Sequence, residues 1–312
     1  MKLPASERIH NGVAPPVYPN QKDTEQAKEK VAKKGSDPYA PALTVKDLTH
    51  PISLQESSIE VAGIKLDLLR AGGETNDHLL VYYPAKEVLF SGDLIYRSFP
   101  NLYSIRGTKY RDVNKWIASL NTMLGKNAKT LVMGHTRPFE GQQQVQQALT
   151  NYRDAVSHIF SKTIEGMNKG LTPDQLVEYA KLPEHLAKDS NLAPLYGNPD
   201  WSIRGIYDGY LGWFDGNPTN LDPLPPTQEA QKYLTLMGGA AKVAQATQQA
   251  IADKEYRWAL QLSDKLLAVD SHNQQYKSLK AEALILLADN TLNTLARNYY
   301  KTYAAELQQG KQ

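Results

Sequence analysis

The chain has 312 residues and a formal net charge of +2, with 41% hydrophobic and 22% charged residues. This composition is typical of a globular protein and provides no strong field for binding nucleic acid or an anionic membrane. No cysteine is present, which excludes disulfides, thiolate catalysis and cysteine-held metals. Any metal ion must therefore be held by His, Asp or Glu.

Residues 1–45 mix prolines with a lysine-rich run, KEKVAKKG, and contain few apolar residues. The segment has no apolar core of a secretory signal, and no run in the chain reaches the roughly 18 to 20 apolar residues of a membrane span. Two interpretations stay open: an irregular, solvated lead-in, or an internal segment of a longer protein.

Residues 46–145 have the pattern of an α/β domain. SIEVAGIKLDLLRAG alternates around Ala62-Gly63 and predicts a hairpin, and HLLVYYP with VLFSGD predicts another. From Tyr110 the apolar period changes to that of a helix, and KTLVMGH then predicts a buried strand. Strand, helix and strand in this order form an α/β unit.

Residues 146–312 are predicted to be all-helical. A long helix is expected to close at Gly170, and a short one to begin at the N-cap Thr172 with a proline in its first turn. After a proline-rich connector, the residues from Gln228 onward predict paired helices of tetratricopeptide type. The predicted fold is thus α/β plus all-α, with the boundary near residue 145.

Three chemically active side chains follow predicted strands: Glu74, Asp93 and His135. Residues just beyond strand ends project into the crevice where α/β proteins form their sites, and the preceding glycines permit close backbone approach. Taken singly, each is more simply a loop, turn or hydrogen-bonding residue. Taken together in this order, they predict a site for zinc or another divalent ion.

The stretch GETNDHLLVYYPAKEVLFSGD resembles the second half of the metallo-β-lactamase fold, whose common form is GHTPxHLxxxxPxxxxLFxGD. Within that superfamily, NLYSIRGTKYRD, GHTRPFEG and YLGWFDGNPTNLDPLPP resemble class III alkylsulfatases. The resemblance covers residues 46–308, and GWFDGNP is its most specific signal. It implies the C-terminal half of an αββα sandwich followed by a helical dimerisation domain.

The resemblance implies hydrolysis of alkyl sulfate esters such as dodecyl sulfate by a zinc-activated water. On this reading Glu74, Asp93 and His135 are metal ligands, and Asn101 and Arg106 bind the sulfate group. Asp93, bridging two cations, and Arg106, whose planar donors suit an oxyanion, are the predicted catalytic residues. Without the resemblance, Asn101 is a turn residue and Arg106 a partner of Asp112.

Supporting roles are assigned to two further residues of the same stretch. The superfamily often has a histidine at the position of His78 without using it as a metal ligand, so His78 is expected to support the site from behind. The same interpretation is given to Asp77.

The chain departs from the family pattern at three points. The HxHxDH motif is absent, so the two zinc ions of the intact family are reduced to one or none. The sterol-carrier-like domain that commonly follows is absent too. Trp201 stands where the branch tends to have a histidine that donates a proton to the leaving group.

Two rival functions stay open: a catalytically inactive dimerisation or binding fragment, and another hydrolase of the fold, such as a phosphodiesterase or lactonase. Expected partners are an alkyl sulfate and a second copy of the chain, with no nucleic acid. The aromatics of 196–214 predict either an alkyl channel or core packing; they are Tyr196, Trp201, Tyr207, Tyr210 and Trp213. The compartment is unknown, and is periplasmic or secreted if a missing segment carries an export signal.

Overall fold

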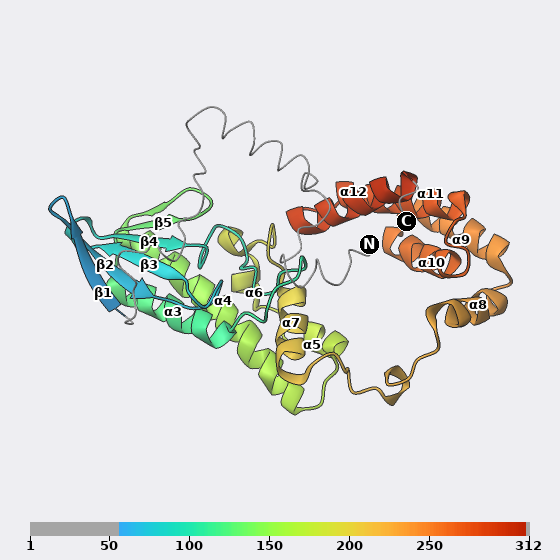
Figure 1. Ribbon diagram of the computed structural model, residues 1–312, viewed down its shortest axis with the longest axis horizontal. Coiled ribbons are helices and arrows are strands. Elements are labelled where there is room, and N and C mark those ends of the chain that lie inside the picture. The colour runs from blue at the N-terminus through green and yellow to red at the C-terminus, as the bar shows by residue number, and fades with distance from the viewer. Residues whose placement is uncertain (1–55, 310–312) are drawn as a thin grey trace, which may run out of the picture. The chain divides into compact units, whose positions relative to one another are not determined.

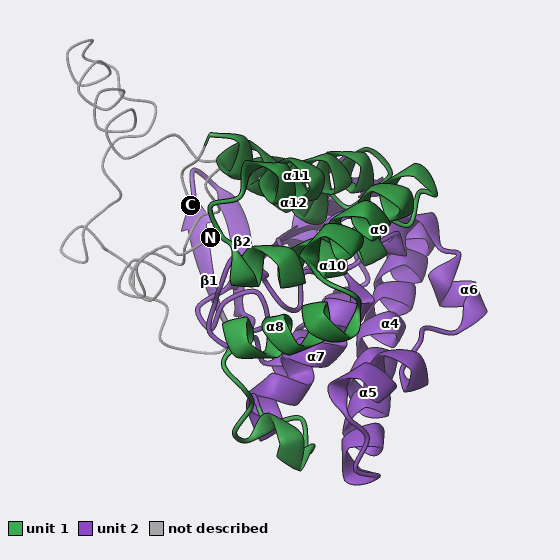
Figure 2. Cartoon of the chain, turned by 90° about the vertical axis from the view of Figure 1, so that its right-hand side faces the viewer, with its two compact units in different colours: residues 1–17, 214–312 green, residues 18–213 purple. Residues whose placement is uncertain are grey.

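The computed structural model describes residues 56–309, which divide into two compact units after Trp213 (Figure 2). The α/β unit, purple in Figure 2, holds the sheet and its covering helices, and the described part of the other unit, green, contains helices and no strand. The predicted lead-in, residues 1–45, and the two histidines within residues 1–55 lie outside the described residues.

Six strands form one mixed sheet in the order β1-β2-β3-β4-β5-β6. Figure 1 labels the first five of them. All neighbours are antiparallel except β4 and β5, which are parallel and joined by a helical crossover. The strand bounds are β1 Glu56–Val61, β2 Ile64–Arg70, β3 Leu79–Tyr83, β4 Val88–Gly92, β5 Thr130–Met133 and β6 Phe139–Glu140.

Both predicted hairpins are confirmed. Val61 pairs with Ile64, and Ala62 and Gly63 between them both have positive φ, as a two-residue turn of a right-twisted hairpin requires. β3 and β4 are joined by the short 3₁₀ helix η2, Pro84–Lys86, and their inward residues Leu80 and Leu89 are fully buried.

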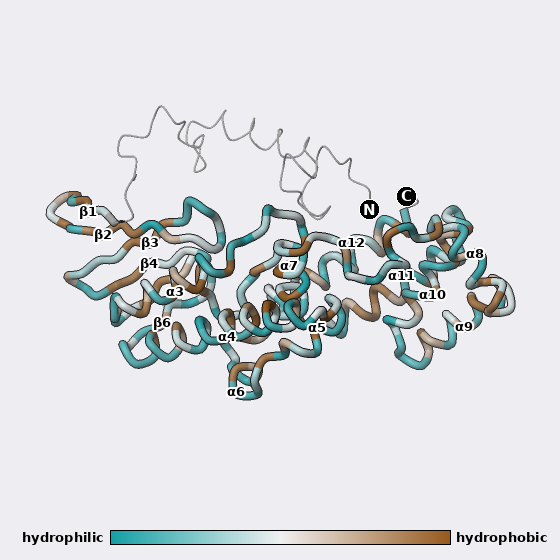
Figure 3. Tube along the Cα trace, turned by 90° about the horizontal axis from the view of Figure 1, so that it is seen from below, coloured by the Kyte–Doolittle hydropathy of each residue, from teal (hydrophilic) through white to brown (hydrophobic). Residues whose placement is uncertain are grey.

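Helices α3, Val113–Lys126, and α4, Gln142–Asn168, cover the sheet and pack against each other (Figure 1). Trp116 and Leu120 of α3 are fully buried, as the helical spacing predicts. In Figure 3 hydrophobic colour marks β3 and β4, while α4 alternates between hydrophobic and hydrophilic positions, as a helix with one buried face does.

Shorter helices complete this unit: α5 Pro173–Tyr179, α6 Glu184–Ala187, η3 Ser190–Leu192 and α7 Pro199–Leu211. Thr172 caps α5 in a full capping box with Gln175, confirming the predicted helix start. Residues from Leu69 to Tyr207 share one hydrophobic core. The predicted boundary at residue 145 therefore falls inside α4, whose buried face belongs to the core of the sheet, and the compact unit continues to Trp213.

The helical unit contains η4 Pro218–Asn220, α8 Pro226–Leu236, α9 Ala240–Ala252, α10 Tyr256–Val269, α11 Gln274–Asp289 and α12 Thr294–Gln308. The predicted helix pair is confirmed as α10 and α11, with Ala259, Leu262 and Leu266 packing near Leu279 and Ala283. Among the described residues, no helix has the length and apolar character to cross a bilayer.

Candidate active site

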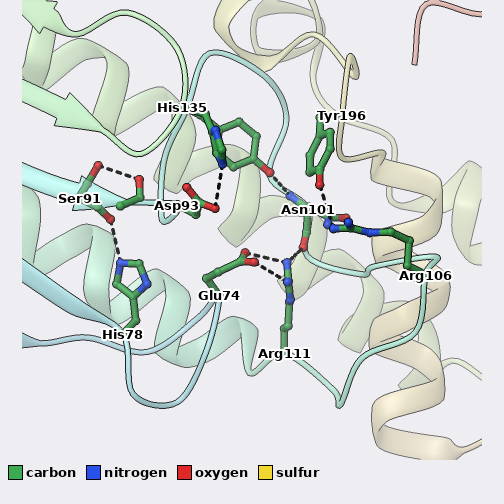
Figure 4. A network of polar contacts seen from close by, with 11 residues as sticks. Glu74, His78, Ser91, Asp93, Asn101, Arg106, Arg111, His135 and Tyr196 are labelled. Atoms are coloured by element: carbon green, nitrogen blue, oxygen red, sulfur yellow. Dashed lines mark hydrogen bonds and ion pairs between the residues drawn. The ribbon is translucent and has the colours of Figure 1, made fainter. Parts of the chain in front are cut away.

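Asp93 and His135 meet at one edge of the sheet. Asp93 directly follows β4 and His135 follows β5 after one residue, and because these strands are parallel their carboxyl ends share an edge. The Asp93 Oδ2 atom lies 3.4 Å from His135 Nε2 (Figure 4), and the two side chains are 37% and 74% exposed. This pair is open to solvent and can contact a bound ion or substrate.

Two glycines allow neighbouring side chains to approach the backbone closely at this strand edge. A Cβ atom at Gly134 would lie 2.4 Å from Asp93 Oδ1, and one at Gly92 would lie 2.8 Å from the His78 ring. Gly92 also has a φ of +52°, in the left-handed region that glycine tolerates best. The glycines preceding Asp93 and His135 are therefore required by close approach.

Glu74, the third predicted ligand, lies in the loop between β2 and β3 and faces Arg111 (Figure 4). Its Oε2 atom accepts a hydrogen bond of 2.7 Å from Arg111 Nη1, and its Oε1 atom accepts one of 2.5 Å from Nη2. The Arg111 side chain is only 10% exposed and that of Glu74 21% exposed. This bidentate, largely buried ion pair uses both carboxylate oxygens.

Arg111 is also the last residue of the loop that carries the predicted sulfate-binding residues Asn101 and Arg106. Residues 101–111 carry no regular secondary structure, and we call them the anion loop. At its start, Asn101 is 3% exposed; its carbonyl accepts a 2.5 Å hydrogen bond from Arg111 Nη1, and its N–H donates to the Tyr96 hydroxyl. At its end, Asp112 caps α3 by accepting from the N–H of Lys115.

Burial dominates the electrostatics of this cluster. It raises the pKa of Glu74; the positive charge of Arg111 opposes that rise, and the negative charge of Asp93 adds to it. Burial likewise raises the pKa of Tyr96, whose hydroxyl therefore stays protonated. Among the described residues, the buried Asn101 Oδ1 and Arg111 Nε atoms have no hydrogen-bond partner, so this cluster keeps unused polar capacity.

Arg106 lies in the middle of the anion loop and donates a 3.0 Å hydrogen bond from Nη2 to the Tyr196 hydroxyl. Tyr196 in turn meets the Tyr96 ring edge to face, with centroids 6.0 Å apart. A polar pocket of about 210 Å³ is lined by residues 73–76, which include Glu74, and by residues 108–112. The two predicted sulfate-binding residues thus share one loop beside the strand edge.

His78 and Asp77 lie on the approach to β3. The His78 Nε2 atom is 2.8 Å from the carbonyl of Ser91, one residue before Gly92 (Figure 4). His78 therefore contacts the turn that carries Asp93, and its supporting role stays a prediction. Asp77 is exposed, and a hydrogen bond from Thr75 lowers its pKa.

The aromatic segment divides between core and surface. Tyr207 is buried in the core, whereas Tyr210 and Trp213 are 49% and 72% exposed. Trp201 lies half-buried in the first turn of α7. Core packing therefore accounts for Tyr207, and the exposed rings retain apolar surface.

The donors in the described part of the chain do not form a complete metal site. Asp93 and His135 are neighbours, but Glu74 is engaged by Arg111, and residues 56–309 contain no group of at least three metal-ligating side chains. Catalytic zinc in proteins generally has three protein ligands, so these residues alone do not fit one.

Arg111 is the residue of this cluster that sequence reasoning missed. It stands directly before the helix cap Asp112, where an arginine is usually a solvated residue. One feature of the sequence could have indicated Arg111. Glu74 is predicted to lie in a loop at the strand edge of Asp93 and His135, and a carboxylate there needs a cation as a partner.

Comparison with known proteins places these features in a family. Residues 3–135 match the metallo-beta-lactamase superfamily, and residues 172–310 match alkyl sulfatase dimerisation. A linear primary-alkylsulfatase from Pseudomonas sp. is 39% identical over 250 residues, covering 80% of this chain and 47% of that protein. An (R)-specific secondary-alkylsulfatase from Pseudomonas sp. is 35% identical over 80% of this chain and 38% of its own length.

A solved structure gives the same result in three dimensions. The stereoselective inverting sec-alkylsulfatase Pisa1 from Pseudomonas sp. matches with a TM-score of 0.78 and 34% identity, over 83% of this chain and 42% of that chain. The fold predicted from the sequence, part of a metallo-β-lactamase domain followed by helices of the dimerisation type, is confirmed. The chain spans less than half the length of these relatives.

Proposed function

We propose that this chain, which belongs to the alkylsulfatase family of the metallo-β-lactamase superfamily, forms part of an enzyme that hydrolyses alkyl sulfate esters. The observation that carries the proposal is the position of the anion loop. It holds Arg106 and the buried Asn101 in one loop, close to Asp93 and His135 at the strand edge (Figure 4). The names of the relatives supply the substrate class.

Arg106 and Asn101 would bind the sulfate group. A guanidinium offers several donors in a plane and keeps its charge, so it suits an oxyanion at any physiological pH. Negative charge on the sulfate grows as the ester bond breaks, and fixed donors stabilise that charge most at this stage. Tyr196, which accepts from Arg106, would hold the guanidinium in place.

Membership of the superfamily implies metal dependence, and we propose zinc as the metal. Of the three predicted ligands, Asp93 and His135 have exposed side chains that are not held by a cation, and a complete zinc site needs more ligands than this pair. The proposal therefore requires ligands beyond the described residues.

The test measures zinc and turnover on the full chain. Bound metal is determined by mass spectrometry after dialysis, and hydrolysis of octyl sulfate is compared with that of a phosphodiester, bis(p-nitrophenyl) phosphate. Bound zinc with preferential octyl sulfate hydrolysis supports the proposal. Preferential phosphodiester hydrolysis instead favours a different hydrolase of this fold.

A matched pair of variants tests whether Arg106 takes part in the hydrolysis. Arg106→Gln should lower kcat/KM for octyl sulfate by about 10²-fold, the typical effect of removing one oxyanion donor. Arg257→Gln, an exposed arginine on α10, makes the same chemical change in the helical unit and should leave the rate unchanged. Equal activity of the two variants would remove Arg106 from the mechanism.

A second candidate is an inactive assembly module. The incomplete donor set favours it, as does the match of residues 172–310 to a dimerisation model. In this case the chain forms a homodimer, which light scattering after gel filtration detects, and binds no zinc. Absence of both zinc and turnover in a dimeric protein would decide for this candidate.

A further inference from the structure

Arg111 connects the loop after β2 with both ends of the anion loop. One nitrogen, Nη1, donates to Glu74 and to the carbonyl of Asn101, at 2.7 Å and 2.5 Å, and Nη2 donates to the other oxygen of Glu74. Arg111 is itself the last residue of the anion loop, so its side chain closes the loop onto its own first residue.

Two polar contacts hold the backbone of Asn101 at the start of the loop. The N–H of Asn101 donates to Tyr96, and its carbonyl accepts from Arg111. Removing Arg111 would leave a buried carboxylate and a buried carbonyl without their charged donor. Such a loss is usually large, because the desolvated partner is left uncompensated.

The same contacts decide what Glu74 can do. Both of its oxygens already accept from Arg111, and the guanidinium supplies the positive charge that a buried carboxylate needs. A metal ion at Glu74 would have to displace a bidentate, 10%-exposed arginine. By contrast, Asp93 and His135 face each other with open sides.

We propose that Arg111 is a positioning residue that fixes the anion loop, and that Glu74 is its counter-ion instead of a metal ligand. The inference deepens the proposed function, because it explains how Asn101 and Arg106 are held for sulfate. Arg111 acts through the loop and does not itself need to touch the substrate.

The test uses the full chain and three variants: Glu74→Gln, Arg111→Met and the double variant. Amide hydrogen exchange is followed in residues 101–111, with α12 as the internal reference. Each single variant should speed exchange of the loop on the order of tenfold, since either change breaks the same pair. The double variant should exchange no faster than Arg111→Met, because the pair can be lost only once.

Glu229→Gln provides the matched control. Glu229 pairs with Lys265 within the helical unit, so the variant also breaks a Glu–cation pair. It should leave exchange of residues 101–111 unchanged. Far-UV circular dichroism shows whether each variant is folded, and Arg111→Lys, which keeps charge but loses the planar fork, should give an intermediate rate.

Two ligand titrations complete the test. Octane-1-sulfonate, which cannot be hydrolysed, should bind about tenfold more weakly to Arg111→Met than to the unmodified chain. Zinc chloride should bind Glu74→Gln as it binds the unmodified chain, and Asp93→Asn more weakly.

Unchanged loop exchange in either single variant would overturn the positioning role. Loss of zinc binding in Glu74→Gln, with zinc binding retained in Arg111→Met, would show that Glu74 is a ligand and would also overturn the proposal. Failure of the proposed function looks different: the unmodified chain would bind no sulfonate, while exchange of residues 101–111 would still respond to the variants.

Discussion

The two units of this chain are stabilised by different kinds of core. In the α/β unit, Trp116, Tyr152 and Phe99 are fully buried between the sheet and its helices. In the described part of the helical unit every aromatic ring keeps some exposure, and the buried residues are mainly alanine and leucine. Large rigid rings fix the strand edge, whereas small residues let helices approach closely.

The chemistry follows the same division. Every residue assigned to the candidate site, from Glu74 to His135, lies in the α/β unit, as does Tyr196. The described helical unit carries none of these residues, and it lies within the segment, residues 172–310, that matches alkyl sulfatase dimerisation. The candidate site residues thus belong to one core and the helices from α8 onward to another, so variants should affect the two units separately and by different mechanisms.

The largest expected effect comes from Trp116→Ala. The indole is fully buried, and its Nε1 donates a 2.9 Å hydrogen bond to the carbonyl of Leu94. Its removal should destabilise the α/β unit by about 3–5 kcal/mol through the cavity left behind. Calorimetry should show only the transition of this unit moving, and the exposed Trp258→Ala should change stability by about 0.5 kcal/mol or less. A shift of both transitions by Trp116→Ala would contradict the separation of the units.

Ala281→Leu tests the helical unit by the opposite mechanism. Ala281 is fully buried in the small core that α11 forms with α12. Added methyl groups cannot be accommodated, so overpacking should destabilise this unit by about 1–3 kcal/mol. Ala246→Leu makes the same change at an exposed position of α9 and serves as the control. If urea denaturation shows equal stability for both variants, the helices are not packed as closely as described.

Gly92→Ala tests the strand edge that carries Asp93. Alanine at a φ of +52° costs about 1–2 kcal/mol, and its Cβ would lie 2.8 Å from the His78 ring. The variant should be less stable in urea, and the imidazole signals of His78 should shift in NMR spectra. Gly125→Ala in α3 meets no atom within 4 Å and should stabilise the helix by about 0.5–1 kcal/mol. Unshifted His78 signals would mean that the turn relaxes without moving the ring.

Much of this structure follows from local patterns. The hairpin turn at Ala62-Gly63, the buried face of α3 and the cap at Thr172 each depend on residues close in sequence. The meeting of Asp93 and His135 also follows, because a strand–helix–strand unit places consecutive parallel strands side by side.

The partner of Glu74 did not follow, for a physical reason. Glu74 and Arg111 are 37 residues apart, on two loops whose meeting depends on how α3 packs on the sheet. A family pattern assigns a position to Glu74, but it does not show which positively charged group pairs with its carboxylate. The extent of the α/β unit was similarly hidden, because α4 has an amphipathic pattern that fits either unit.

The smallest expected effect concerns the surface of the α/β unit. Hydrogen bonds from Lys162, Lys169 and Tyr179 lower the pKa of the half-exposed Glu165 on α4 to about 2. A carboxyl whose pKa is lowered by folding adds stability above its ordinary pKa near 4.5 and loses it as the pH falls through about 2. The melting temperature of the unmodified chain should therefore exceed that of Glu165→Gln slightly at neutral pH, and the gap should close between pH 4.5 and 2. Glu229→Gln in the helical unit should leave the α/β transition in place throughout. If the difference in melting temperature persists undiminished at pH 2, Glu165 contributes through packing of its side chain. The charge of this surface residue would then add little to the stability of the α/β unit.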